Sequence, residues 1–236
     1  MKTTLSLLTS ALLAYDGACG ATIAINFDTD AKGLPITAPS GFMDTKHLAE
    51  LYAVLGVHFS GPRGGNDGGA ILNQAGNFGV NARSGVNFLA FNRSAEAMMI
   101  DGGIPRDPER ITFDTLMSDI SIFVAGGGTG RTFVMQAFDS NGNLTDTDTI
   151  LTQSYSQLQV ASAAGIRSVT ISVTDSGNDV VFVLDDLSAT TIPEPSAALL
   201  LCAVFALAGG ARSRRSCPNS EIPASGRLRS EQLPSG

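Results

Sequence analysis

Residues 110–138 read RITFDTLMSDISIFVAGGGTGRTFVMQAF, and this stretch decides the fold class. It contains three runs in which apolar, often β-branched or aromatic, side chains alternate with polar ones, at residues 110–114, 118–125 and 131–138. Alternation with a period of two predicts strands that are buried on one face. The glycines between the second and third runs predict a turn.

The same pattern continues on both sides of this stretch. It predicts further strands at residues 22–27, 54–60, 87–91, 167–173 and 180–187. The sequence DSNGN at residues 139–143 predicts a hairpin turn, because Asn141 and Gly142 suit positive φ angles. Only residues 44–53 look helical, and residues 61–79 form the longest stretch expected to be irregular. We therefore expect an all-β protein, an antiparallel β-sandwich over residues 22–191.

Composition excludes several classes of function for this sandwich. The chain has a net charge of −7, and residues 22–191 contain twice as many acidic as basic side chains, which argues against nucleic-acid binding. The three cysteines (Cys19, Cys202 and Cys217) lie outside residues 20–201, so thiol catalysis, a cysteine zinc site and a disulfide framework are excluded there. Two histidines, His47 and His58, are too few for a histidine-rich metal site.

The first 21 residues have the pattern of an export signal. Lys2 precedes an apolar stretch at residues 5–14 that is too short to span a bilayer, and small residues follow up to Ala21. A helix retained in the mature chain is the alternative. Lipidation of Cys19 also stays open, although Asp16 stands where a lipoprotein signal has an aliphatic residue.

The C-terminal part has a different pattern. Pro193, Glu194 and Pro195 precede residues 196–211, which carry no charge, and a basic cluster of Arg212, Arg214 and Arg215 follows. We expect residues 196–211 to form a single transmembrane helix, with the arginines on the cytoplasmic side. Residues 216–236 are predicted to be a polar, disordered tail.

The order Pro-Glu-Pro, apolar span and arginine cluster resembles the PEP-CTERM sorting signal of exported bacterial proteins. The resemblance covers residues 193–215 and implies processing by an exosortase, a membrane protease, and a setting of extracellular polysaccharide and biofilm. Such signals usually end soon after the basic cluster. The continuation over residues 216–236 departs from this pattern.

The sandwich resembles jelly-roll modules with a galactose-binding-like topology. The resemblance rests on four segments: INFD at residues 25–28, ELYAVLGVHFS at 50–60, AFDSNGN at 137–143 and FVLDDL at 182–187. Each motif is loose, so the resemblance implies a fold rather than an activity.

Asp185 and Asp186 are the most informative polar residues, because they interrupt an apolar strand. Carboxylates near a sandwich interior need a cation or several hydrogen-bond donors. The jelly-roll resemblance implies a structural Ca²⁺ between the first and last strands, held by Asp28 or Asp30 together with Asp185 or Asp186. The alternative is that the aspartates pair with arginine or accept bonds from backbone N–H groups.

The sequence predicts no enzyme. It has no G-x-S-x-G motif, and Ser60 and His58, on the same face of one strand, do not make a triad without a placed acid. We expect an exported cell-surface or extracellular-matrix protein with a structural or adhesive role, and weak glycan binding to extracellular polysaccharide. The absence of tryptophan argues against a strong sugar platform. The alternative function is a secreted carbohydrate-active enzyme or a dedicated carbohydrate-binding module.

Overall fold

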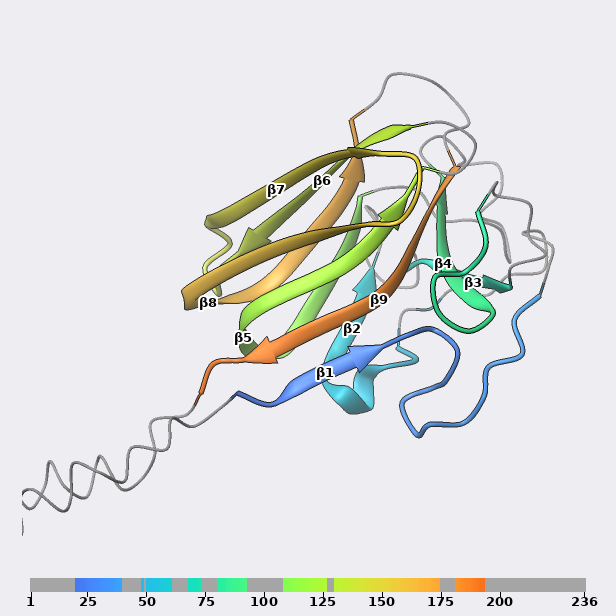
Figure 1. The fold of residues 1–236 in the computed structure, drawn as a ribbon. Coiled ribbons are helices and arrows are strands. Elements are labelled where there is room, and N and C mark those ends of the chain that lie inside the picture. Colours follow the sequence, from blue (N-terminus) through green and yellow to red (C-terminus); the bar gives the residue numbers. More distant parts are fainter. Residues whose placement is uncertain are drawn as a thin grey trace, which may run out of the picture. The chain divides into compact units, whose positions relative to one another are not determined.

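The computed structural model describes residues 20–39, 48, 50–60, 68–73, 80–92, 108–126, 130–174 and 181–193. The chain divides into two compact units, Met1–Glu194 and Pro195–Gly236, and every described residue lies in the first (Figure 1). The predicted transmembrane helix, the tail and the export signal therefore lie outside the described residues, apart from Gly20 and Ala21. Within the described part, no helix is long and apolar enough to cross a membrane.

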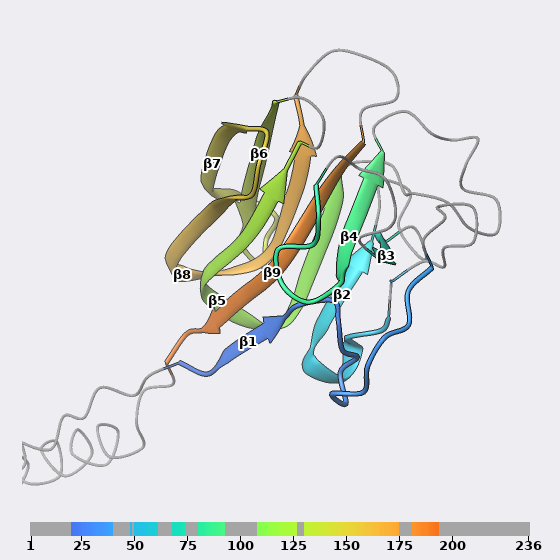
Figure 2. The same cartoon turned by 45° about the vertical axis from the view of Figure 1, so that its right-hand side comes forward.

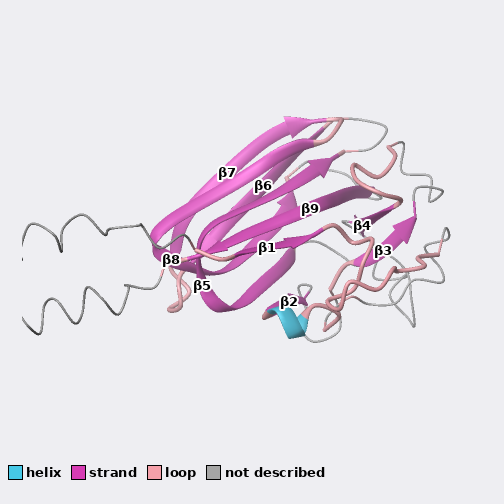
Figure 3. Cartoon of the chain, turned by 60° about the horizontal axis from the view of Figure 1, so that its bottom comes forward, coloured by secondary structure: helices cyan, strands magenta, loops and turns pink. Residues whose placement is uncertain are grey.

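Strands make up nearly all of the regular structure (Figure 3). They are β1 (Thr22–Ile25), β2 (Val57–Ser60), β3 (Ala70–Asn73), β4 (Asn87–Asn92), β5 (Glu109–Ala125), β6 (Arg131–Phe138), β7 (Leu144–Thr152), β8 (Ser156–Val173) and β9 (Val181–Thr191). Each pair of neighbouring strands is antiparallel. The prediction of an all-β, antiparallel sandwich is confirmed.

The two long strands, β5 and β8, run through both layers of the sandwich (Figure 2). The start of β5 pairs with β2 on one side and with residues 168–171 of β8 on the other. The end of β5, residues 119–125, pairs instead with β9 on one side and with residues 156–161 of β8 on the other. The register shifts on either side of Met117 mark the change from one layer to the other. Bulges of this kind bend a strand and increase its twist.

We name the two layers after their characteristic strands. The β7 layer contains β7, β6, residues 168–173 of β8, the start of β5, and β2. The β9 layer contains residues 156–161 of β8, the end of β5, and β9, followed by β4 and β1, which pair with β9 one after the other along the same edge, and by β3 beside β4. One sheet thus folds over to face itself.

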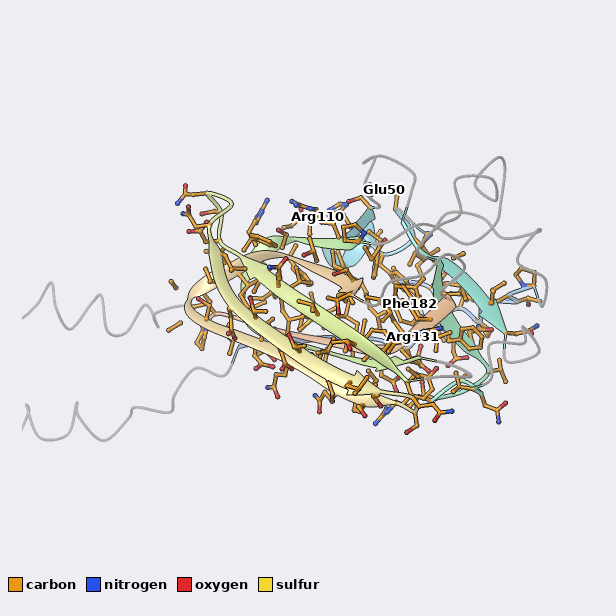
Figure 4. The ribbon with its side chains drawn as sticks, turned by 90° about the horizontal axis from the view of Figure 1, so that it is seen from above. Glu50, Arg110, Arg131 and Phe182 are labelled. Atoms are coloured by element: carbon orange, nitrogen blue, oxygen red, sulfur yellow. The ribbon has the colours of Figure 1, made fainter. Side chains whose placement is uncertain are left out.

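The core lies between the layers and follows from the alternation in each strand. In β6, for example, Phe133, Met135 and Ala137 are buried, and the residues between them are partly exposed. Phe133 of the β7 layer meets Phe182 of the β9 layer edge to face, with ring centroids 5.6 Å apart. Figure 4 shows Phe182 in the interior. Such aromatic pairs add to the stability that burial of apolar area supplies.

Two carboxylates join the layers along the side where β7 and the start of β8 would otherwise be free edges. Asp146 accepts hydrogen bonds from the backbone N–H of Thr147 and Ala161, at 2.8 and 2.9 Å. Asp148 accepts in the same way from Thr149 and Gln159, each at 2.8 Å. Each carboxylate therefore takes one N–H from β7 and one from β8, and unpaired edge donors are satisfied without a ladder.

Aromatic rings fill the opposite side, near β1 and β2. Phe27, Tyr52 and Phe59 are fully buried, with ring centroids 6.0–6.2 Å apart. The Tyr52 hydroxyl donates to the carbonyl of Thr29 at 2.9 Å, which ties the turn before β2 to the segment after β1. Packing of these rings and the Tyr52 hydrogen bond together close this side.

Three expectations about local structure need correction. Within the described part of residues 44–53 there is no α-helix: residues 50–52 form turns, and a single 3-10 turn spans Ala53–Leu55. Burial of Tyr52 and the left-handed Gly56 (φ 70°) end this turn and delay the strand predicted from residue 54 until Val57. The stretch 61–79 is not wholly irregular, because β3 lies within it.

The strands were also longer or more numerous than predicted. Residues 110–114 and 118–125 belong to one strand, β5, and β7 and the first half of β8 were not predicted. The hairpin at residues 139–143 is confirmed, with Gly142 at φ 81° and Asp139 accepting from the N–H groups of Asn141 and Asn143. The Asn143 side chain also donates to Asp139, and this bond, together with the backbone N–H bonds, lowers the pKa of Asp139.

Candidate functional site

The two aspartates in β9 are held by the segment that precedes β4. Asp185 is fully buried, and its Oδ2 accepts from the N–H groups of Arg83 and Ser84 at 2.8 and 3.1 Å, while its Oδ1 accepts from the N–H of Asp186 at 2.8 Å. Burial, supplemented by the charge of Asp186, raises the pKa of Asp185 to about 6 against the lowering effect of these bonds. Asp186, at φ 50°, pairs with the Arg83 guanidinium and accepts from Ser84 Oγ at 2.7 Å.

Asp28 lies after β1 and binds the same segment further along. Its Oδ1 accepts from the N–H groups of Val86 and Asn87 at 2.9 and 3.1 Å. Asp30 instead closes its own turn, because its Oδ1 accepts from the N–H groups of Lys32 and Leu34. The structure therefore brings Asp28 and Asp185 to one segment, residues 83–87, and leaves Asp30 outside this arrangement.

These contacts bear on the predicted calcium ligands. Among the described residues, no group of three or more histidine, cysteine, aspartate or glutamate side chains is arranged to hold a metal ion. The partners of Asp28, Asp185 and Asp186 are backbone N–H groups, a hydroxyl and an arginine, which is the alternative that the sequence left open. Calcium binding stays a prediction from the sequence.

The outer surface of the β7 layer carries the polar half of the strand alternation. Two rows of side chains cross it, each in register from strand to strand. The first row is His58, Thr112, Ser168 and Phe138, and the second is Ser60, Arg110, Thr170 and Gln136. We call these eight residues the polar face; Ser168, in the middle of the first row, is buried at 6% exposure. With strands about 4.8 Å apart, each row spans roughly 14 Å from β2 to β6.

The polar face combines hydrogen-bonding groups with one aromatic ring. Arg110 is exposed, and its guanidinium carbon lies 5.9 Å from the ring centroid of Phe138. Arginine offers up to five N–H donors, and glutamine and the hydroxyl residues both donate and accept. The arrangement can thus hydrogen-bond several hydroxyl groups of an extended ligand and pack against its apolar side.

His58 marks the β2 edge of the polar face. Its Nδ1 lies 3.0 Å from Glu50 Oε2 and its Nε2 lies 3.2 Å from Asp114 Oδ1. Figure 4 shows Glu50 and Arg110 on the same side of the sandwich. Because both ring nitrogens are directed at carboxylates, His58 is not oriented to take a proton from Ser60, its same-face neighbour in β2.

These carboxylates also favour the protonated imidazole. The hydrogen bond to Glu50 contributes most, and together with Asp114 it raises the pKa of His58 above its ordinary 6.5. A raised folded-state pKa adds stability that is fully present below pH 6.5 and is lost as the pH rises through the folded-state value.

We expect the substitution His58→Gln to lower the melting temperature most near pH 6 and progressively less towards pH 9. Thermal unfolding at intervals across this range measures the effect. The double substitution Glu50→Gln, Asp114→Asn should flatten the same pH dependence while keeping the histidine. A loss in His58→Gln that stays constant from pH 6 to 9 would contradict this account.

The sorting-signal residues contribute little to this description. Pro193 follows β9 and is exposed. Glu194, Pro195, Arg212, Arg214 and Arg215 lie outside the described residues.

Sequence reasoning missed the polar face. The alternation that predicted β2, β5, β6 and the end of β8 also identified the outward side chains, but it could not show that these four strands are adjacent. Adjacency depends on the crossing of β5 and β8 between layers.

No protein-family model matches the chain, and no curated protein matches it. Solved structures of low identity do match. The K2 cleaved adhesin domain of Lys-gingipain is 12% identical, with a TM-score of 0.43, over 72% of this chain and 100% of that domain. A DUF4465 family protein from Bacteroides caccae is 11% identical, with a TM-score of 0.41, over 76% of this chain and 96% of the other.

A xylan-binding domain from Paenibacillus barcinonensis is 12% identical, with a TM-score of 0.36, over 75% of this chain and 97% of that domain. With TM-scores below 0.5, these likenesses carry no argument about what the present chain binds.

Proposed function

We propose that this chain is a non-catalytic, exported β-sandwich protein that binds polysaccharide through the polar face and has an adhesive role. The observation that carries the proposal is the polar face itself: two registered rows of hydroxyl, amide and guanidinium groups beside one ring, on four adjacent strands. A polysaccharide presents repeating hydroxyl groups along an extended chain, which matches rows of donors and acceptors. Affinity from such exposed contacts is modest, because each hydrogen bond replaces one to water.

The proposal includes four predictions made from the sequence: export, processing by an exosortase, a C-terminal membrane helix and a jelly-roll topology. The adhesive role needs no catalytic group. Because Glu50 and Asp114 engage both ring nitrogens of His58, the geometry speaks against a Ser60–His58 nucleophile.

Binding to a panel of insoluble polysaccharides (cellulose, xylan and chitin) and to soluble glycans by affinity electrophoresis tests the proposal. We expect Arg110→Ala and Gln136→Ala each to weaken binding about tenfold, since one lost hydrogen bond of about 1–1.5 kcal/mol corresponds to that factor. Gln157→Ala is the matched control, because Gln157 is an exposed glutamine of β8 in the β9 layer.

Retention that is equal in all three variants would place binding elsewhere, and retention on no polysaccharide would refute the proposal. Release of soluble sugar from any member of the panel would instead favour the enzyme.

A further inference from the structure

The space where calcium is predicted is occupied by the protein's own backbone. Segment 83–87 passes between Asp185 on one side and Asp28 on the other. N–H groups of Arg83 and Ser84 point to Asp185, and those of Val86 and Asn87 point to Asp28. Four of the five residues in this segment therefore donate their backbone N–H to one of two carboxylates.

Gly85, the fifth residue, fills the space in front of Asp28. A Cβ atom on Gly85 would lie 2.1 and 2.4 Å from the two carboxylate oxygens of Asp28 and 2.3 Å from the carbon between them. The glycine Cα is therefore packed directly against this carboxylate, at the place from which a cation bound by both carboxylate oxygens would approach. Asp28 Oδ2, which is buried without a hydrogen-bond partner, faces this carbon.

The remaining carboxylate is also engaged. Asp186 pairs with Arg83, and the Arg83 guanidinium carbon lies 3.4 Å from the ring centroid of Phe123. A cation beside Asp186 would have to displace this arginine. Asn87 Oδ1 is a further buried oxygen without a partner near this segment, but calcium takes six to eight oxygen ligands.

We propose that Asp28 and Asp185 are acceptors that clamp segment 83–87 onto β9 and the end of β1, in place of a bound calcium ion. The clamp gives these part-buried and exposed N–H groups carboxylate acceptors, and hydrogen bonds to a carboxylate are a strong form of hydrogen bond. It also fixes the position from which Arg83 covers Phe123. The sandwich then has no requirement for a divalent cation at this place.

Thermal unfolding of the full chain in EDTA and in millimolar Ca²⁺, for the wild type and for Asp28→Asn and Asp185→Asn, tests the proposal. We expect the wild-type melting temperature to agree within about 1 °C between the two conditions. Asp185→Asn should melt several degrees lower than the wild type by the same amount in both conditions, because both oxygens of Asp185 accept N–H groups and an amide replaces one of them with a donor. Asp28→Asn should lose less, again equally in both conditions, because only Oδ1 of Asp28 accepts and the amide keeps that oxygen while losing the charge.

Terbium luminescence gives a second readout that does not depend on stability. We expect that neither Asp28→Asn nor Asp185→Asn removes a saturable terbium signal. A calcium-dependent rise in melting temperature that disappears in Asp28→Asn or Asp185→Asn would overturn the proposal. A rise that persists in both variants would support it, because the ion would then bind elsewhere.

Discussion

Replacing Gly85 by alanine should destabilise the protein by about 3–5 kcal/mol, more than other glycine substitutions in the described turns. Gly85 has φ 53°, and a left-handed alanine costs about 1 kcal/mol on its own. The added Cβ would overlap the Asp28 carboxylate, which two N–H groups hold in place. Relief requires breaking those bonds or moving the segment, each costing a further 1–3 kcal/mol or so.

Gly142→Ala is the matched control for this experiment. Gly142 also has positive φ, 81°, but a Cβ there would meet nothing within 4 Å. We expect it to cost only about 1 kcal/mol. Denaturant unfolding of both variants measures the difference, which isolates the overlap with Asp28.

A double-mutant cycle with Asp28→Ala sharpens the test of Gly85. Once the carboxylate is removed, the additional cost of Gly85→Ala should shrink towards that of Gly142→Ala. Equal costs of Gly85→Ala with and without Asp28 would show that the carboxylate does not restrict the glycine.

Removing the two carboxylates that join the layers should have the second-largest effect. We expect Asp146→Ala with Asp148→Ala to cost roughly 2–4 kcal/mol, because four backbone N–H groups lose their acceptor and must turn to water. For a domain of this size, that lowers the melting temperature by about 4–16 °C.

The double variant should also self-associate, since it exposes donors on two neighbouring edges. Analytical ultracentrifugation at increasing concentration measures association, and calorimetry measures stability. Thr147→Ser with Thr149→Ser is the control, because each of these exposed side chains directly follows one of the two aspartates on β7. A monomeric double variant with wild-type stability would show that the carboxylates do not close this side.

The sequence predicted those strands in which buried apolar residues alternate with exposed polar ones. In β6 the buried Phe133, Met135 and Ala137 alternate with partly exposed residues, so both the strand and its inner face could be identified. β7 was missed because aspartates occupy two of the inward positions of its edge, and their partners are β8 N–H groups more than ten residues away. Local pattern carries no signal of such pairing.

The candidate site was predictable only in part. The interruption of an apolar strand by Asp185 and Asp186 correctly indicated a demand for several donors or a cation. The donors, Arg83 and Ser84, lie about a hundred residues earlier in a segment with no distinctive pattern. In the same way, the polar residues of β2, β5, β6 and β8 were visible singly, and only the strand order shows that they form one surface.

The pairing of β1 with β9 has a consequence for synthesis of the chain. Thr22 pairs with Thr190, and Ile25 pairs with Leu187. The first strand therefore has no partner until residues 187–190 have been synthesised. β4 pairs with β3 along one edge, and its other edge also pairs with β9. The pairs β6–β7 and β3–β4 can form early, whereas β1 has no partner strand until β9 has been synthesised. Contacts this distant slow folding, and completion of the β9 layer becomes the final event.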